Sequence, residues 1–136
     1  MTTLNAQVIG QAHYAARAVL ERELEQLGLR FEENLVLTAV AGGLTEHDAV
    51  VARLKTSLKV GDAVAREAIT AVRDRGLLTG DQTVALTESG AELQGRVQII
   101  SGGIAGRLYD GLPADDLAVA GRVLTLITER ANAELG

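Results

Sequence analysis

The sequence lacks cysteine altogether and is poor in the residues that most often carry chemistry. It contains two histidines, two tyrosines, one phenylalanine, one proline and no tryptophan in 136 residues. Without a thiol, the chain has no disulfide, no thiolate nucleophile and no Cys/His metal cage. No nucleophile paired with a base, no carboxylate pair and no phosphate-binding loop is apparent either. We therefore expect no catalytic residue, no metal and no cofactor.

Long apolar runs are also absent, although 47% of the residues are apolar. No segment approaches the roughly 18 consecutive apolar residues that cross a bilayer. The first residues, Met1–Asn5, lack the basic stretch followed by an apolar one that marks a secretion signal. We therefore expect a cytoplasmic protein with no membrane partner. The length predicts a single domain over residues 1–136.

Negative charge predominates, because the formal net charge is −5. This balance argues against bulk attraction to nucleic acid, so any phosphate contacts must come from a local patch. The segment from Thr45 to Leu78 has six basic and five acidic residues, a net charge of +1, which leaves −6 for the remainder. Its basic residues are Arg53, Lys55, Lys59, Arg66, Arg73 and Arg75. The sign suits DNA binding, and an ordinary solvated surface explains it equally well.

Helical periodicity predicts four helices in the first half of the chain, over residues 4–27, 31–41, 45–58 and 62–76. The first, second and fourth end at glycines, which accept left-handed backbone geometry at little cost. Thr45, with Asp48 three residues on, is a variant of the capping box, and Asp62 is expected to cap the fourth helix. A short turn containing Gly61 joins the third and fourth helices, which is the helix-turn-helix pattern.

A short β-hairpin and two long helices are predicted to follow. Leu77–Leu78 and Val84–Leu86 flank the polar turn Thr79–Gln82. Two short apolar segments joined by a polar turn of this length are typical of a β-hairpin, which would form the wing. Thr87 opens a fifth helix, and Pro113 opens a sixth that has two aspartates at its positive end. The apolar residues expected on the inward stripes are Leu93, Val97, Ile100, Ile104 and Leu108 in the fifth helix and Leu117, Ala120, Leu124, Ile127, Ala131 and Leu135 in the sixth.

The predicted fold class is therefore mainly α, a winged helix-turn-helix with six helices and a short β-hairpin wing. Residues 31–87 are expected to form the winged helix-turn-helix, and residues 1–30 and 88–136 the dimerisation helices. Amphipathic helices at both ends of so short a chain predict a homodimer whose apolar stripes are buried between those helices.

The fifth predicted helix contains several interior glycines, at positions 95, 102, 103 and 106. Each costs about 0.5–1 kcal/mol relative to alanine, so we expect something to offset it. Gly102 and Gly106 lie one turn apart, which favours the close approach of a partner helix. A break beside a ligand cavity and simple tolerance in a packed helix are the alternatives.

Two stretches of the sequence resemble a known family. Ile69–Leu78 ends a predicted helix in Gly-Leu, and Val84–Leu93 contains the pattern Leu-Thr-x-x-Gly-x-x-Leu directly after the hairpin. They resemble the end of the recognition helix, the wing strand and the start of the fifth helix in MarR-family winged helix-turn-helix regulators. The resemblance implies a dimer that reads a palindromic double-stranded DNA operator with its fourth helix and wing. It also implies release of the DNA when a small phenolic or carboxylate ligand binds near the dimer interface.

Two departures from the family pattern shape the expected DNA contacts. The family's wing carries an arginine that enters the minor groove, whereas the tip Thr79–Gln82 contains no cation. Ala63 and Val64 stand where the family has small hydroxyl residues; they can touch a thymine methyl group but donate no hydrogen bond. We therefore expect base contacts from Arg66 and Thr70. The residues expected to hold phosphates are Lys55, Lys59 and Arg73.

Each of these candidates has a plainer interpretation. Arg66, near the start of the helix expected to enter the groove, can bond guanine through two nitrogens. It can equally form a surface ion pair with Asp62, four residues before it. Lys55, Lys59 and Arg73 suit solvated cations as well as phosphate contacts.

A ligand site is expected at His13, Tyr14 and Arg17, which lie within one turn of the first helix. Arg17 would pair with an organic anion, while the imidazole or the phenol orients it. Ordinary packing or a role at an interface is the alternative for this cluster.

Three functions are compatible with these observations. The one we favour is a ligand-responsive, DNA-binding transcriptional regulator of the repressor type. The alternatives are a dimeric small-molecule-binding protein or enzyme that keeps the scaffold but has lost DNA binding, and an adaptor that binds other proteins through the fourth helix.

Overall fold

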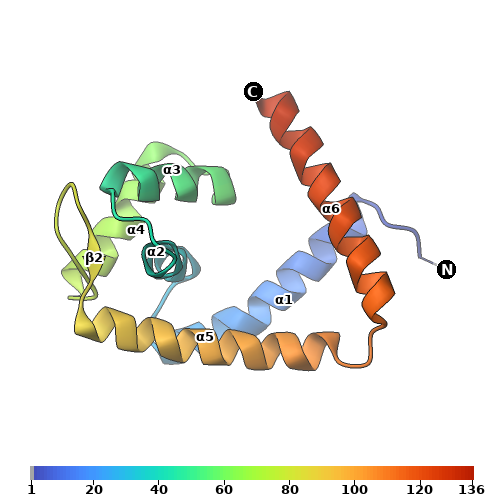
Figure 1. The fold of residues 1–136 in the computed structure, drawn as a ribbon, viewed down its shortest axis with the longest axis horizontal. Helices are drawn as coiled ribbons and strands as arrows, with labels where there is room; N and C mark the ends of the chain where they lie inside the picture. Colours follow the sequence, from blue (N-terminus) through green and yellow to red (C-terminus); the bar gives the residue numbers. More distant parts are fainter. Residues whose placement is uncertain (1) are drawn as a thin grey trace. The chain divides into compact units, whose positions relative to one another are not determined.

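The computed structural model describes residues 2–136, which form six α-helices and one two-stranded antiparallel sheet. In chain order these are α1 (Ala6–Gln26), α2 (Phe31–Ala41), α3 (His47–Leu58), α4 (Asp62–Asp74), β1 (Leu78–Thr79), β2 (Ala85–Leu86), α5 (Glu88–Tyr109) and α6 (Ala114–Leu135) (Figure 1). The chain divides into two compact units, one ending at Ile104 and one comprising Ala105–Gly136. The predicted class, a mainly α winged helix-turn-helix with a short hairpin, is confirmed. No helix in residues 2–136 combines the length and apolar character needed to cross a membrane.

Helices α1 and α2 begin and end close to their predicted positions. The Asn5 side chain accepts the Val8 amide at 2.9 Å and caps α1, so the helix starts at Ala6 rather than at Leu4. Gly28 follows α1 with a φ of 73°, a left-handed geometry that turns the chain towards α2. The glycine stop predicted from the sequence is therefore confirmed.

The start of α3 differs from the prediction, because Thr45 is not its N-cap. Glu46 occupies that position and makes no side-chain cap bond. The cause is pairing with the wing: the Thr45 carbonyl accepts the Val84 amide at 2.7 Å, and the His47 amide donates to the Gln82 carbonyl at 2.8 Å. Long-range backbone pairing has replaced the local cap that the sequence pattern indicated.

The start of α4 also differs from the prediction. Gly61 is the N-cap, and Asp62 is the first residue of the helix. The Asp62 carboxylate makes no cap bond, because it contacts the basic side chains of Arg66 and Lys55 instead. A residue predicted to stabilise a helix end is thus part of a surface charge cluster.

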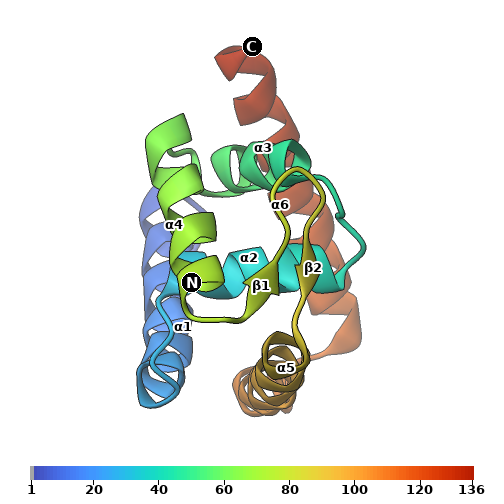
Figure 2. The same cartoon turned by 90° about the vertical axis from the view of Figure 1, so that its left-hand side faces the viewer.

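The hairpin forms as predicted, with Leu78 opposite Leu86 and Thr79 opposite Ala85. Figure 2 shows it standing beside α2, with its loop next to the start of α3. Its buried residues are on the side of the core, where Leu78 contributes from β1 and Val84 from the residue before β2. The wing is therefore held both by its ladder and by the start of α3.

The junction between the hairpin and α5 is fixed by Thr87. Its hydroxyl donates to the Gly76 carbonyl at 2.7 Å and accepts the Gly90 amide at 3.0 Å, which makes it the predicted cap of α5. Gly90 is required here, because a Cβ at this position would overlap the Leu77 carbonyl oxygen. The Leu-Thr-x-x-Gly pattern thus has a physical explanation in close packing of α5 against the chain before the hairpin.

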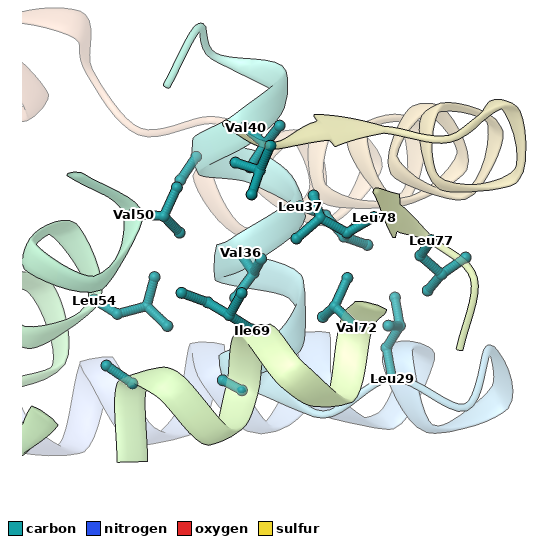
Figure 3. Close-up of a cluster of buried hydrophobic side chains, with 14 of the residues drawn as sticks. Leu29, Val36, Leu37, Val40, Val50, Leu54, Ile69, Val72, Leu77 and Leu78 are labelled. Carbon is teal, nitrogen blue, oxygen red and sulfur yellow. The ribbon is translucent and has the colours of Figure 1, made fainter. Parts of the chain in front are cut away.

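One apolar core joins α2, α3, α4 and the hairpin. Figure 3 shows Val36 of α2 against Ile69 of α4, with Val50 and Leu54 approaching from α3. The largest fully buried side chains are Leu24, Leu37, Leu54, Ile69, Val36, Val50, Val72 and Val84. Burying each such side chain stabilises the fold by about 1.5–3 kcal/mol. This core holds α4 in place while leaving its other side exposed.

Helix α5 runs unbroken from Glu88 to Tyr109, which excludes a break at its glycines. A Cβ placed at Gly95, Gly102 or Gly106 would meet no atom within 4 Å. Within the described chain, therefore, no neighbour requires glycine at these positions. The close approach of a partner helix stays a prediction.

Helix α6 has no buried side chain. On its predicted inward stripe, the exposed fraction is 39% for Leu117, 37% for Leu124, 40% for Ile127 and 73% for Leu135. Within the unit Ala105–Gly136 taken by itself the stripe is not buried, because only the end of α5 is there to pack against α6, and its burial between two copies of the chain stays a prediction.

Candidate nucleic-acid interface

Helix α4 lies at the edge of the first unit (Figure 2). Its side chains are buried along one side only. The buried residues are Ala65, Ala68, Ile69 and Val72. With 100° between successive residues, the opposite side carries Ala63, Glu67, Thr70 and Asp74, all of them exposed. Arg66 and Arg73 flank this outward stripe. The helix is therefore an exposed rod whose outermost side chains include two acids, with its cations along one edge.

Arg66 is half exposed, at 49%, and lies in a cluster of opposite charges. Its Nε donates to Oδ2 of Asp62 at 2.5 Å, and one terminal nitrogen lies 3.8 Å from Oδ1 of Asp48. Lys55 of α3 places its Nζ 3.6 Å from the other oxygen of Asp62. The surface ion pair anticipated between Arg66 and Asp62 is thus formed, and Lys55 joins it.

This geometry shifts two pKa values. The hydrogen bond from Arg66 lowers the pKa of the Asp62 carboxyl below its ordinary value, and the positive charges of Arg66 and Lys55 add to this effect, while desolvation, the second-largest influence, opposes it. The same hydrogen bond raises the pKa of Arg66. Asp62 is therefore ionised, and Arg66 charged, throughout the neutral range.

Lys59 and Thr70 are exposed, as contact with nucleic acid requires. Lys59 ends α3 with a φ of 56°, and it is the one residue other than glycine with positive φ in residues 2–136. Left-handed geometry at a non-glycine residue is uncommon and lets the chain turn directly from α3 into α4. The turn therefore places a cation between the two helices of the helix-turn-helix.

Arg73 lies next to the wing, in the last turn of α4. Its Nε is enclosed by protein and has no hydrogen-bond partner in the described structure. It lines a pocket of about 510 Å³ between the start of α3 and the hairpin loop, together with Glu46, His47, Asp48, Asp81 and Gln82. Three of these residues are acidic, so the pocket itself is not suited to a phosphate. Arg73 and Arg66 share one neighbour, Asp48, which lines this pocket and lies 3.8 Å from Arg66.

The wing tip carries no basic side chain. Gly80 and Asp81 form the turn, and the chain from Thr79 to Thr87 contains neither lysine nor arginine. Gly80 has a φ of 97°, which the tight turn requires. The loop is anchored instead by the bond between the Gln82 carbonyl and the start of α3.

The three residues of the predicted ligand site are near one another on α1, but Arg17 already has partners. Its guanidinium bonds Glu21 at 2.7 Å, lies 3.7 Å from Glu32 and stacks 4.0 Å above the Phe31 ring. His13 and Tyr14 form an edge-on ring pair with centroids 5.1 Å apart, and both are exposed.

A pocket of about 660 Å³ lies beside the Arg17 partners rather than beside the ring pair. Glu21, Phe31 and Glu32 are among the residues that line it, where the end of α1 meets the start of α2. His13 and Tyr14 do not line it. A ligand in this pocket would therefore contact Glu21, Phe31 and Glu32, which are the present partners of Arg17, before it could contact Arg17 itself.

One charged cluster was missed by sequence analysis. Glu33 is almost fully buried, accepts the Arg30 amide at 2.7 Å and lies 3.5 Å from Arg75, whose guanidinium also donates to the Gly28 carbonyl at 2.5 Å. The cluster ties the end of α4 to the turn between α1 and α2. The spacing of Arg30 and Glu33 is that of a capping box, which is the signal that could have found it.

The helix order, the pair α3 and α4 joined by a short turn, and the hairpin after them define a winged helix-turn-helix protein. No family model and no curated protein matches the sequence. Comparison with solved structures identifies the fold as the MarR type, because the similar structures include MarR family proteins and proteins described as transcriptional regulators.

The chain is similar to the transcriptional regulator PA3341, with a TM-score of 0.79 and 22% identity over 96% of this chain and 98% of that one. It is similar to CouR from Rhodococcus jostii RHA1, solved with p-coumaroyl-CoA, with a TM-score of 0.76 and 17% identity over 89% and 88% of the two chains. It is also similar to the MarR family protein Rv2887 of Mycobacterium tuberculosis, solved with DNA, with a TM-score of 0.73 and 17% identity over 93% and 98%. At these identities the likeness is one of fold.

Proposed function

We propose that this protein is a ligand-responsive transcriptional regulator of the MarR type, which represses by binding double-stranded operator DNA as a homodimer. The observation that carries the proposal is the exposure of α4: a winged helix-turn-helix core buries one side of it and leaves Arg66 and Thr70 accessible near its centre. A MarR family protein with the same fold, Rv2887, was solved with DNA, which supports the same use of the fold here.

In this proposal the site residues have distinct roles. Arg66 and Thr70 contact base edges in the major groove, because Thr70 lies on the outward stripe of α4 and Arg66 lies next to that stripe. Lys55 and Lys59, from the end of α3 and the turn after it, contact phosphates. Arg73 contacts a phosphate in this proposal only if its guanidinium reaches outside the acidic pocket that it lines.

The homodimer is proposed from the distribution of exposed apolar side chains. Of the thirteen large apolar side chains exposed in residues 2–136, nine lie in the unit Ala105–Gly136. They are Leu108, Tyr109, Leu112, Leu117, Val119, Leu124, Leu126, Ile127 and Leu135. Clustering of this kind marks an interaction surface, and in the proposal a second copy of the chain covers the stripe of Leu117, Leu124, Ile127 and Leu135 within it, with the helices of 1–30 and 88–136 forming the dimerisation region. Twofold symmetry then presents α4 in duplicate to a palindromic site.

The ligand proposed is a small phenolic acid or another organic carboxylate. A carboxylate can replace Glu21 or Glu32 at the Arg17 guanidinium, and the neighbouring pocket of about 660 Å³ has room for an aromatic acid. His13 and Tyr14 would contact the ligand's exposed end. CouR was solved with p-coumaroyl-CoA, which makes hydroxycinnamates and their thioesters the first compounds to test.

The test is a selection of duplexes from a randomised library by the purified wild-type chain, followed by titration of the enriched sequence at several salt concentrations. We expect a palindromic preference and an affinity whose logarithm falls by about 0.9 per phosphate contact for each unit of log salt. Arg66→Ala should abolish the preference, whereas Arg22→Ala, which removes an exposed cation from α1, should not. A folded dimer that enriches no sequence even at low salt would contradict DNA regulation.

A second candidate function has one observation in its favour. The outermost stripe of α4 includes Glu67 and Asp74, and the wing tip has no cation, so the surface repels phosphates in part. A small-molecule-binding protein that keeps the scaffold without binding DNA is consistent with this. Thermal stabilisation by a phenolic acid together with no measurable affinity for any duplex would favour that function.

A further inference from the structure

Asp62 is the point at which two of the candidate DNA-binding cations meet. Its Oδ2 accepts Nε of Arg66 at 2.5 Å, and its Oδ1 lies 3.6 Å from Nζ of Lys55. It is half exposed and makes no helix-cap bond, so capping does not explain its position. A carboxylate at the start of a helix that meets a polyanion is unfavourable for binding, which calls for a compensating role.

The atoms involved define that role. Arg66 has five N–H donors in a fixed planar fork, and Asp62 engages the one on Nε. The hydrogen bond of Arg66 is made at Nε, and the other carboxylate beside it, that of Asp48, lies 3.8 Å from one terminal nitrogen, beyond hydrogen-bond distance, which leaves the terminal nitrogens available for DNA. Guanine presents two acceptors, O6 and N7, to such a pair of donors. A guanidinium that is held at Nε therefore approaches the DNA in a fixed orientation, with its two terminal nitrogens free to bond guanine.

Lys55 makes this arrangement compatible with DNA. Its ammonium group lies on the other oxygen of Asp62, so the carboxylate is neutralised from α3 while it holds Arg66 on α4. Asp48 differs from Asp62, since it contacts Arg66 only weakly and is 90% exposed. Asp48 can therefore compete with DNA for Arg66 but cannot orient it.

We propose, on the basis of the proposed function, that Asp62 is the positioning residue for base recognition: it holds Arg66 at Nε so that the terminal nitrogens read a guanine in each operator half-site. Asp62 thus lowers affinity for DNA in general and raises discrimination between bases. Removing the Asp62 carboxylate should therefore raise the affinity for DNA in general and lower the discrimination between bases, so a single substitution of Asp62 tests both effects.

The experiment uses the full-length chain and the duplex enriched by the wild type. Variants Arg66→Ala and Arg66→Lys first identify the base pair that Arg66 reads, because lysine keeps the charge and loses the planar fork. Affinity is then measured for duplexes with guanine or adenine at that position and for an unrelated duplex. A well-placed bidentate contact gives the wild type about 5- to 150-fold discrimination.

We expect Asp62→Asn to bind the unrelated duplex more tightly than wild type and to lose most of the discrimination at the Arg66 position. The matched control is Asp74→Asn, which removes the same charge from the exposed side of the same helix and should raise affinity for all duplexes without changing discrimination. In the Arg66→Lys background, Asp62→Asn should cause no further loss of discrimination. Unfolding midpoints of all variants establish that they are folded.

The outcomes separate the two proposals. Enrichment of no sequence by the wild type overturns the proposed function, and this inference with it. Specific binding in which Arg66 reads no guanine, or in which Asp62→Asn keeps the wild-type discrimination, overturns the inference and leaves the function standing. Equal loss of discrimination in Asp74→Asn also overturns it, because general charge would then be the cause.

Discussion

The two units of the chain use apolar residues in opposite ways. In the unit that ends at Ile104, leucine, isoleucine and valine side chains from α2, α3, α4 and the hairpin are enclosed in one core. In the unit Ala105–Gly136, helix α6 is as rich in leucine but buries no side chain at all. The same residue type is therefore structural in one unit and, in our proposal, an interaction surface in the other.

The difference teaches where stability originates. A core closed within one chain contributes at any protein concentration, whereas an apolar stripe covered by a second copy contributes only when the copy is present. The first unit is thus expected to depend on its own packing, and the second on assembly. Substitutions matched between the units can separate these two sources.

The largest effect is expected from a charge placed on the exposed stripe of α6. Leu124→Asp should convert a dimer into a monomer, so that the mass in solution falls from twice 14.3 kDa to 14.3 kDa. A symmetric interface loses two leucines at once, each contributing about 1.5–3 kcal/mol when buried, and gains two charges that must be desolvated. Light scattering coupled to gel filtration measures the mass.

Ala133→Asp provides the control for that substitution. It places the same charge on α6, about 180° from Leu124 around the helix, and it should leave the dimer intact. A wild-type chain that is a monomer at micromolar concentration, or a Leu124→Asp variant that remains a dimer, would contradict the proposed use of the stripe.

The next largest effect concerns the core of the first unit. Leu37→Ala should lower the free energy of unfolding by about 2–5 kcal/mol, because the side chain is fully buried and leaves a cavity. Leu126→Ala removes the same atoms from a 43% exposed position on α6, away from the predicted stripe, and should cost less than about 0.5 kcal/mol. Denaturant unfolding measures both. Similar losses for the two variants would mean that α6 is packed as tightly as the core.

Most of the fold could be predicted from the sequence, because the signals that start and end its helices are local. Gly28 and Gly76 end helices, and Thr87 starts one, through backbone geometry and hydrogen bonds within a few residues. Thr45 was misassigned as a cap because its carbonyl is taken by Val84, a partner far along the chain that no local pattern reveals. Local signals therefore located the helices but not every bond at their ends.

The candidate site was less predictable than the fold. The pair of Arg66 and Asp62 follows from their spacing of four residues on one helix, and the structure forms it. The addition of Lys55 from α3 depends on how two helices pack, and so does the enclosure of Arg73 beside the wing. Contacts between elements decide which cations stay near the exposed side of α4, and periodicity within one element does not contain that information.

A smaller effect distinguishes two threonine hydroxyls, one at the start of α5 and one in the interior of α6. Thr87→Ala should lower the free energy of unfolding by about 1 kcal/mol, since it removes the cap of α5 and the bond to the Gly76 carbonyl. Thr128→Ala, in α6, removes a hydroxyl that only bonds back to the Leu124 carbonyl, and it should be neutral or slightly stabilising. Chemical denaturation of the two variants checks this, and an equal cost for both would mean that Thr87 does not anchor the junction.

The smallest effect is the pH dependence contributed by Asp62. The folded state lowers the pKa of this carboxyl, chiefly through the hydrogen bond from Arg66, so the folded chain binds this proton less readily than the unfolded chain. The stabilising contribution is therefore fully present above the ordinary carboxyl pKa and is lost as the pH falls from there through the lowered value. Carbon NMR of the side-chain carboxyl follows the titration directly. Arg66→Gln should return the Asp62 pKa towards its ordinary value, and Arg53→Gln, which removes a cation from α3 outside the cluster, should leave it low. An Asp62 titration unchanged by Arg66→Gln would mean that the ion pair between Asp62 and Arg66 is not formed in solution.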